Sequence, residues 1–287
     1  MPLFPGFDIE EAKMLVAMIA DMEGPTPPLD DPPLPADWTL IFDSNPFGPF
    51  DNRWQLYKDD QNSTRFALLI RGTVNQAGSI IADLLAVMIQ ANGAIQFGPG
   101  GELIDLKYYF ADPANVKAGV HLGFALAALM MMYDPSCGIV PRLRELVRQG
   151  EIPPDSGIYI AGHSQGAAVA TLCHSLLYYK RENAIDLPDF TYKTYLFAQP
   201  KPGNDHYGND YNRIAAATGM AFGVNNDQDW VPQVPLTLQS LADLNKPNPL
   251  SIIENILFSW FMKLIHWVVL QVRKLIHVPG HRSKAQR

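Results

Sequence analysis

Residues 157–179 restrict the fold of this chain more than any other stretch of its sequence. An apolar run (GIYIA) is followed by the pentapeptide GHSQG and then by an alanine-rich run (AAVATLCHSLLYY). The first run has the length and composition of a strand buried on both faces, and the second has those of a closely packed helix. Gly162 and Gly166 lie two residues to either side of Ser164, where a sharp turn leaves no room for side chains. We therefore predict a strand, a strained turn at Ser164 and a helix.

This order of elements is the one in which the motif G-x-S-x-G forms a nucleophile elbow. The serine hydroxyl then lies at the start of a helix, where free N–H groups and the helix dipole stabilise a nearby oxyanion. We expect Ser164 to be a catalytic nucleophile, and the backbone N–H of Gln165, the next residue, to donate to the oxyanion. The side chain of His163 is expected to point away from the hydroxyl and to pack against the protein.

Strand and helix patterns alternate along most of the chain. Apolar runs predict strands over residues 52–57, 64–71, 157–161, 191–198 and 220–224, and periodic runs predict helices over residues 76–90, 120–132, 141–149, 166–179 and 210–218. This alternation predicts an α/β fold with a mostly parallel central sheet flanked by helices. We expect residues 1–37 to form a helix capped by Asp8 and a proline-rich connection. Residues 38–287 are expected to form one domain with a helical extension over residues 250–287.

Composition and charge argue against several classes of protein. The formal net charge of −7 argues against a nucleic-acid partner, because phosphate binding requires a basic surface. Two cysteines are too few for a disulfide framework and are expected to be free, buried thiols, and no Cys/His spacing resembles a metal site. We expect neither a metal nor an organic cofactor. The first residues lack the basic and unbroken apolar regions of a signal peptide, which favours a cytoplasmic or peripherally membrane-associated protein over a secreted one.

Several separate stretches of the sequence contain motifs that follow one another in a fixed order. They are residues 66–73 (FALLIRGT), 120–124 (VHLGF), 160–168 (IAGHSQGAA), and 197–204 (FAQPKPGN) followed by 225–235 (NNDQDWVPQVP). In this order they resemble the motifs of the class 3 (fungal-type) lipases of the α/β-hydrolase superfamily. The resemblance implies an α/β-hydrolase fold and a Ser-His-Asp triad that hydrolyses carboxylic esters without a cofactor. It also implies that Thr73 is the first oxyanion-hole residue and that Asp229 is the triad acid.

The position of Asp229 in the chain agrees with this role. Asp229 follows the strand predicted over residues 220–224, and a carboxylate beyond the end of a strand is well placed to orient a histidine. Asp227, two residues earlier, is the alternative, but only Asp229 is followed directly by the Trp-Val-Pro that the resemblance requires.

The triad base should follow the acid in the chain. His281 is our candidate because it follows Pro279-Gly280 and is therefore expected on a loop. The alternatives are His266, His277 and a histidine beyond Arg287.

Two apolar segments bear on the substrate. Residues 76–90 have an apolar face at helical spacing, which suits either a helix buried on the sheet or, by the resemblance, a lid that contacts lipid, with the glycines of residues 93–101 as a hinge or loop. Residues 250–278 carry tryptophans and interspersed cations, which argues against a transmembrane helix and suits either an interfacial helix or additional core helices. We therefore expect a lipid-like ester as substrate, with peripheral lipid contact through residues 74–98 or 250–278.

Taken together, these features predict a serine carboxylic-ester hydrolase, in the first place a triacylglycerol or acylglycerol lipase that forms an acyl-enzyme. A phospholipase A1 and a short-chain esterase are the alternatives among enzymes. A hydrolase scaffold without activity that binds lipid or protein is the alternative of a different class.

Overall fold

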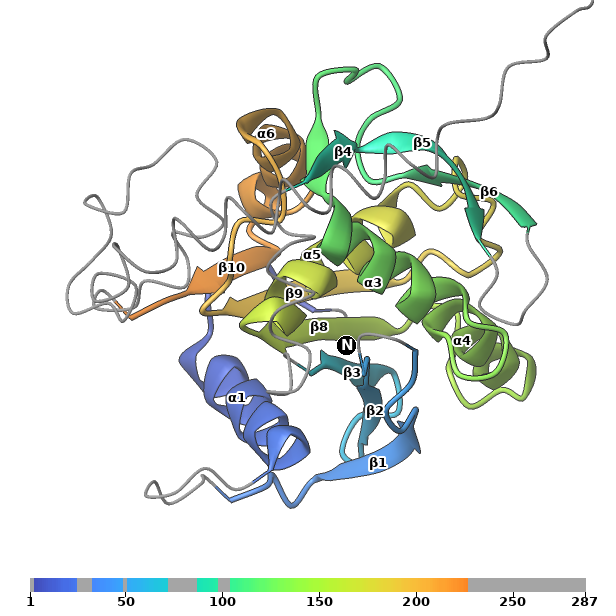
Figure 1. Ribbon diagram of the computed structural model, residues 1–287. Coiled ribbons are helices and arrows are strands. Elements are labelled where there is room, and N and C mark those ends of the chain that lie inside the picture. Colours follow the sequence, from blue (N-terminus) through green and yellow to red (C-terminus); the bar gives the residue numbers. More distant parts are fainter. Residues whose placement is uncertain (1–2, 25–32, 49–50, 72–86, 98–103, 227–287) are drawn as a thin grey trace, which may run out of the picture. The chain divides into compact units, whose positions relative to one another are not determined.

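The computed structural model describes residues 3–24, 33–48, 51–71, 87–97 and 104–226 (Figure 1). The chain divides into two units, residues 1–237 and 238–287, and the second lies entirely outside the described residues, as does the predicted helical extension. The elements of the first unit are α1 (Ile9–Glu23), β1 (Trp38–Asp43), β2 (Trp54–Asp59), β3 (Arg65–Ile70), β4 (Met88–Gln90), β5 (Asn92–Phe97), β6 (Ile104–Tyr109), β7 (Gly119–His121), α3 (Leu122–Tyr133), α4 (Ile139–Arg148), β8 (Gly157–His163), α5 (Gln165–Tyr178), β9 (Thr191–Phe197), α6 (Asp205–Ile214), η1 (Ala216–Thr218) and β10 (Ala221–Val224).

Six strands form the central sheet of this unit, in the order β1-β2-β3-β8-β9-β10. β3, β8, β9 and β10 are parallel to one another, whereas β1 and β2 extend the sheet as antiparallel strands. The prediction of a mostly parallel sheet is confirmed, because three of the five pairings are parallel. Nearly all residues of β3 and β8 are buried, which explains their unbroken apolar sequences.

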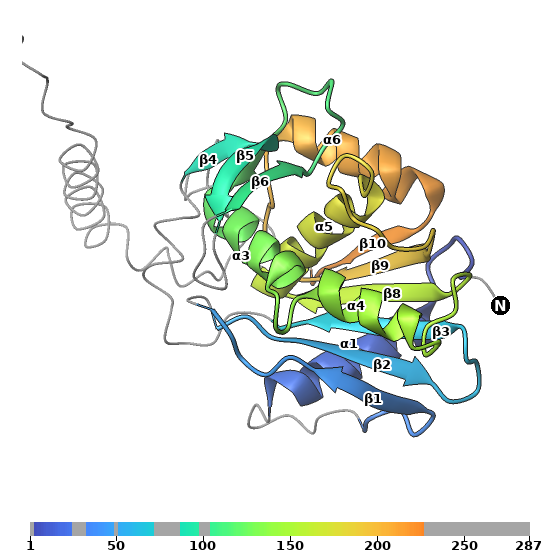
Figure 2. The same cartoon turned by 90° about the vertical axis from the view of Figure 1, so that its right-hand side faces the viewer.

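The sheet buries a separate core on each face, and alternate residues of β8 contribute to the two cores. Ile158 and Ile160 pack in the core beneath α3 and α5, whereas Tyr159 and Ala161 pack on the opposite side with α1. Figure 2 shows this arrangement, with α3, α4 and α5 on one side of the strands and α1 on the other. The strand that leads to Ser164 is therefore held between two layers of helix.

The N-terminal helix begins where the sequence predicts. A carboxylate oxygen of Asp8 accepts hydrogen bonds from the backbone N–H groups of Glu10 (2.8 Å) and Glu11 (3.2 Å), and thereby satisfies two donors of the first turn. The helix buries one apolar side against the sheet, with Leu15, Met18, Ile19 and Met22 among its least exposed residues. Most of the proline-rich connection that follows lies outside the described residues.

The prediction of a helix up to residue 90 is wrong at its end. Residues 88–90 form β4, which pairs antiparallel with β7, so that Met88 lies opposite His121. Residues 92–97 form β5, and the glycine expected in a hinge, Gly93, is part of that strand. A Cβ atom on Gly93 would lie 2.9 Å from the hydroxyl of Tyr108 on the paired strand β6, so this glycine makes room for a ring. Residues 76–86 of the expected lid lie outside the described residues.

The prediction for α6 is wrong at both ends, since the helix stops at Ile214 rather than at residue 218. α6 begins at Asp205 rather than at residue 210, because the side chain of Asn204 caps it by accepting the N–H of Tyr207 (3.0 Å).

Among the described residues, five strands were not predicted: β1, β5 and β6, and also β4 and β7, which occupy the end and the start of runs predicted as helices over residues 76–90 and 120–132. β1 and β5 were missed because they mix polar and apolar residues without a clean alternation, whereas β6 (IDLKYY) does alternate over its first four residues and was overlooked. These strands form by pairing, β1 with β2 and β5 with β6.

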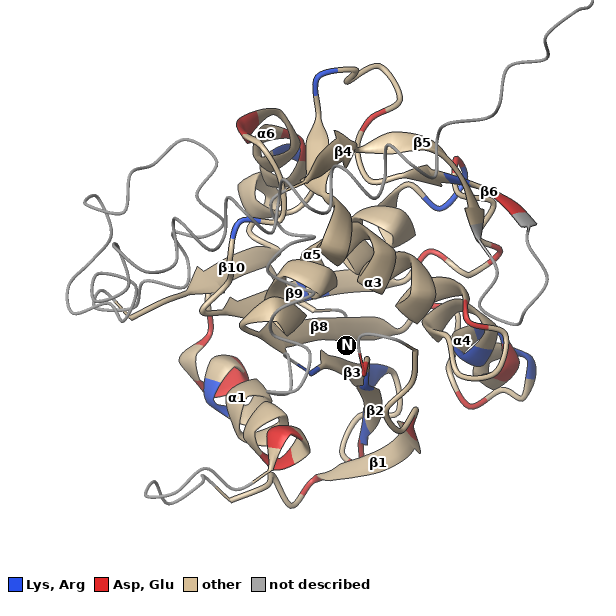
Figure 3. Cartoon of the chain, in the orientation of Figure 1, with Lys and Arg blue, Asp and Glu red and all other residues tan. Residues whose placement is uncertain are grey.

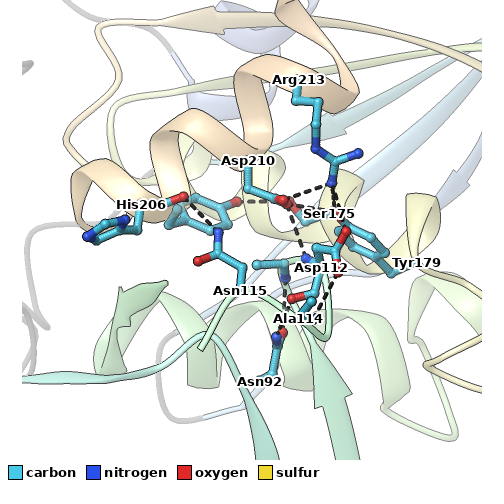
Figure 4. Close-up of polar contacts among 11 residues, drawn as sticks. Asn92, Asp112, Ala114, Asn115, Ser175, Tyr179, His206, Asp210 and Arg213 are labelled. Carbon is cyan, nitrogen blue, oxygen red and sulfur yellow. Dashed lines mark hydrogen bonds and ion pairs between the residues drawn. The ribbon is translucent and has the colours of Figure 1, made fainter. Parts of the chain in front are cut away.

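Charged residues are dispersed over the elements rather than gathered on one of them. Figure 3 shows Lys and Arg beside Asp and Glu on α1, α4 and α6. One polar network, drawn in Figure 4, joins α6 to α5 and to the loop before β7. The buried carboxylate of Asp210 accepts hydrogen bonds from the hydroxyl of Tyr179 (2.7 Å), from Arg213 (2.9 Å) and from the backbone N–H of Asp112 (3.3 Å). The network fixes α6 relative to α5, which begins directly after Ser164.

Both cysteines are free, as predicted. Cys173 is buried in α5 and Cys137 is partly exposed, and burial raises the pKa of each thiol, so neither is a ready nucleophile at neutral pH. Within the described ranges, no helix is long and apolar enough to cross a membrane, and no group of three or more potential metal ligands comes together.

A buried histidine in α5 makes the stability of the fold dependent on pH. The Nδ1 atom of His174 lies 2.9 Å from the hydroxyl oxygen of Thr194 and 3.1 Å from that of Tyr211, and its burial lowers the pKa from 6.5 to about 4. The unfolded chain therefore binds this proton first as the pH falls, and the folded state loses stability between about pH 6.5 and pH 4.

We predict that His174→Gln is less stable than the wild type at pH 7 but loses less stability on acidification. The contribution of His174 to acid destabilisation should be on the order of 3 kcal/mol across this window. Urea unfolding at a series of pH values measures it, with His206→Gln, on the exposed side of α6, as the control. Parallel pH curves for His174→Gln and the wild type would contradict the prediction.

Candidate functional site

Ser164 lies at the junction of β8 and α5, in the strand-turn-helix arrangement that the sequence predicts. Its backbone has φ +54° and ψ −127°, a conformation that non-glycine residues rarely adopt. Two hydrogen bonds hold the turn: the N–H of Ser164 donates to the carbonyl of Phe197 on β9 (2.9 Å), and its own carbonyl accepts from Ala167 (3.0 Å). The backbone of Ser164 is thus held by hydrogen bonds both to the neighbouring strand β9 and to the first turn of α5.

The glycines on either side of Ser164 are required by main-chain contacts. A Cβ atom on Gly162 would lie 2.4 Å from the carbonyl oxygen of Gly166, and one on Gly166 would lie 2.4 Å from the carbonyl oxygen of Ile70 on β3. Neither neighbour is the flexible end of a side chain. The turn therefore brings α5 into direct contact with the backbone of two strands.

The first turn of α5 presents its backbone N–H groups beside Ser164. Gln165 is its first residue, and Ala167 and Ala168 are fully buried, which allows the helix to lie close to the sheet. No intrahelical acceptor exists for the first N–H groups of a helix, so they are available to an oxyanion. The Gln165 side chain is also buried, and its Oε1 has no hydrogen-bond partner within the described part of the chain.

The described parts of the stretches that carry the family resemblance contact one another in pairs. β3 and β8 pair directly, and the segment after β9 contacts the β7–α3 segment through an isolated bridge between Val120 and Gly203. The side chain of Asn204 reinforces this contact by accepting the N–H of Gly119 (3.1 Å). His121 is fully buried and lies edge-on to the ring of Phe124.

His163 faces away from the side of the sheet that α5 covers. It continues the alternation of Tyr159 and Ala161, and its Nδ1 lies 3.2 Å from both carboxylate oxygens of Glu23 at the end of α1. The prediction that this histidine points away from the serine hydroxyl and packs elsewhere is confirmed.

One feature near the site was not predicted. A cavity of about 320 Å³ lies between α5, α6, the end of β9 and β10. Residues from all four elements line it, among them Thr171, Leu196, Gln199, Tyr207, Tyr211 and Phe222. The sequence carries no signal of it because its walls are far apart in the chain.

The remaining predicted site residues lie outside the described residues. They are Thr73, Asp227, Asp229, His266, His277 and His281. Their roles therefore stay predictions, and the geometry of this site rests on Ser164, Gln165 and the elements around them.

Comparison with known proteins agrees with this geometry. A family model described as Lipase (class 3) matches residues 67–239, which is more than half of the chain. The chain belongs to the class 3 lipase family. The matched region of this lipase-family chain contains the junction at Ser164, whereas α1, β1 and β2 lie before it.

Two curated relatives are secreted mono- and diacylglycerol lipases of Malassezia. LIP1 of Malassezia globosa is 26% identical over 159 residues, which cover 53% of this chain and 47% of the relative. LIP4 of Malassezia restricta is 32% identical over 80 residues, which cover 28% of this chain and 24% of the relative. The class 3 lipase-family chain therefore matches less than half of the length of these relatives.

A solved structure supports the fold. The crystal structure of a mutant form of MDLA from Penicillium cyclopium is 24% identical, covers 79% of this chain and 72% of its own, and has a TM-score of 0.51. The predicted α/β-hydrolase fold is thereby confirmed for the class 3 lipase-family chain.

We predict that Gly166→Ala destabilises the fold, because the added methyl group would collide with the Ile70 carbonyl and push α5 away from β3. The loss in the free energy of unfolding should be about 1–3 kcal/mol, measured by chemical denaturation. Gly208→Ala is the matched control: it lies in α6 with nothing within 4 Å of the new Cβ, and alanine is the better helix former. Equal stability of the two variants would contradict the prediction.

Proposed function

We propose that this member of the class 3 lipase family is a serine carboxylic-ester hydrolase that acts on acylglycerols through an acyl-enzyme. The observation that carries the proposal is the backbone of Ser164, held at φ +54° between two glycines that main-chain contacts require. A conformation of this kind costs about 1–3 kcal/mol and persists where function needs it. Here it presents a hydroxyl at the N-terminus of α5, where negative charge is stabilised.

The proposed reaction has two steps. The Ser164 hydroxyl oxygen attacks the ester carbonyl carbon while a histidine takes the hydroxyl proton, and the alcohol leaves with a proton returned by that histidine. Water then attacks the acyl-enzyme with the same histidine as base, which releases the carboxylic acid and restores the serine. The backbone N–H groups of Gln165 and Thr73 are proposed to bind the oxyanion in both steps, each with an effect of a few kcal/mol.

We propose Asp229 as the residue that orients the histidine. β10 ends at Val224, parallel to and directly beside β9, so the segment that follows starts at the same edge of the sheet as Ser164. This position supports an acid within the next few residues. His281 is the proposed base, in the chain order of this fold.

The names of the relatives support the choice of substrate and bear on location. Both Malassezia proteins are named as mono- and diacylglycerol lipases, which favours glycerides among the esters considered. Both are also named as secreted, which favours secretion of this chain over the cytoplasmic or membrane-peripheral location expected from its sequence. Contact with a lipid surface through residues 74–86 or 250–278 remains part of the proposal, whereas residues 88–97 belong to paired strands.

We predict that the chain hydrolyses p-nitrophenyl esters and that Ser164→Ala lowers the rate by at least about a thousandfold, because the nucleophile is removed. Ser136→Ala, at an exposed position after α3, should leave the rate unchanged. A series of acyl chain lengths tests the substrate class: a jump in rate above the solubility limit of the ester indicates a lipase. The absence of turnover at every chain length would overturn the proposed function.

We predict that Asp229→Asn lowers kcat on the order of ten-thousandfold, because the histidine loses its orientation, whereas Asp227→Asn changes kcat by less than about tenfold. His281→Ala should abolish hydrolysis and His277→Ala should not. Steady-state kinetics of the four variants decide the triad. A larger loss of kcat in Asp227→Asn than in Asp229→Asn would make Asp227 the triad acid. A larger loss in His277→Ala than in His281→Ala would make His277 the base.

A further inference from the structure

Helix α1 lies before the region that matches the family, yet it packs against the strand that carries Ser164. It contacts β3, β8 and β9 on the face of the sheet opposite α5 (Figures 1 and 2). Its apolar side is buried there, with Leu15 and Met18 fully inaccessible to solvent. The helix is therefore a fixed part of the fold, and the question is what it does for the site.

The first anchor of α1 is Glu11. Its carboxylate accepts hydrogen bonds from the hydroxyls of Tyr159 on β8 (2.7 Å) and Tyr195 on β9 (2.5 Å), and it pairs with Lys193 (2.6 Å). The Lys193 side chain is only 2% exposed. A buried lysine is stable when a carboxylate faces it, so this cluster ties the start of α1 to the middle of the sheet.

The second anchor is at the other end of α1. The carboxylate of Glu23 contacts Nδ1 of His163, the last residue of β8, at 3.2 Å through both oxygens. Arg53 on the neighbouring segment donates to the carbonyl of Met22 (3.1 Å) and so holds the helix end in place. α1 thus contacts β8 through two polar side chains, with Glu11 at Tyr159 and Glu23 at His163, the residue directly before Ser164.

We propose that Glu23 is a positioning residue for the nucleophile and acts through His163. One peptide unit separates the α-carbon of His163 from that of Ser164, so fixing the histidine limits the movement of the strained turn. A strained conformation persists only where its surroundings determine it fully, and this contact supplies a restraint from the face that α5 does not reach. The proposal rests on the proposed role of Ser164.

This pair is suited to positioning rather than to stabilising the whole fold. The side chains of Glu23 and His163 are 28% and 43% exposed, and polar pairs that are exposed to this degree contribute little to the free energy of unfolding, whether or not the histidine is charged. Small displacements of a reacting atom, by contrast, lower reaction rates strongly. Loss of the pair should therefore affect the reactivity of Ser164 without a comparable effect on stability.

The test is the rate at which a fluorophosphonate labels Ser164 in the full-length chain. Glu23→Gln is expected to lower the labelling rate and the kcat for a p-nitrophenyl ester on the order of tenfold, with KM and the midpoint of urea unfolding unchanged. Glu23→Asp, which keeps the charge, should recover part of the rate. Glu10→Gln is the control, because Glu10 is an exposed residue of the same helix that pairs with Lys13 and should label like the wild type.

A double-mutant cycle with His163→Gln tests whether the effect passes through His163. The effect of Glu23→Gln should largely disappear when His163 is already replaced. Additive effects, an unchanged labelling rate in Glu23→Gln, or a loss of rate that follows a loss of stability would each overturn the proposal. A wild-type chain that is not labelled at all would overturn the proposed function itself, which distinguishes the two failures.

Discussion

The main-chain contact between Gly166 and Ile70 is the constraint on which the rest of this structure depends. It allows the first turn of α5 to lie directly on β3, and the same closeness forces the turn at Ser164 into its strained conformation. A hydrogen bond from Ser164 to Phe197 on β9 then joins the turn to the strand on the other side of β8. Three parallel strands and one helix are thus fixed at a single point, and the proposed nucleophile lies there.

The two faces of the sheet support this point by different means. On the face of α5, small buried residues such as Ala167 and Ala168 permit close packing, and His174 adds a polar contact that depends on pH. On the face of α1, apolar side chains of the helix such as Leu15 and Met18 are buried against the sheet, and charged and hydroxyl groups that meet at Glu11 and Glu23 add polar contacts at both ends of the helix. The first face belongs to the region shared with the class 3 lipase family, and α1 lies outside that region. The helix therefore adds to a family scaffold a second support for the strand that leads to Ser164.

Sequence patterns predicted the elements of the parallel sheet well because these are buried on both faces. β3 and β8 read as apolar runs with clear ends, β9 reads as a strand rich in aromatic and β-branched residues, and α5 reads as a helix of small residues. The same reasoning failed at residues 88–90, the end of an apolar run at helical spacing, which form β4, and at residues 92–97, where a glycine hinge or loop was expected and β5 is found. Such a run fits either structure, and the choice was made by partners distant in the sequence, β7 and β6. The early start of α6 at its Asn204 cap is a local signal that sequence reasoning overlooked.

The sequence by itself determined the junction at Ser164, because two glycines around a serine between a strand and a helix allow few other conformations. It also determined the cap of α1 at Asp8 and the general order of strands and helices. Only the tertiary structure decided that Glu23 meets His163 and that Glu11 meets Lys193, since these pairs are separated by well over a hundred residues and carry no shared pattern. Charged side chains on a helix look solvent-exposed in a sequence, and their burial follows from where the sheet places their partners.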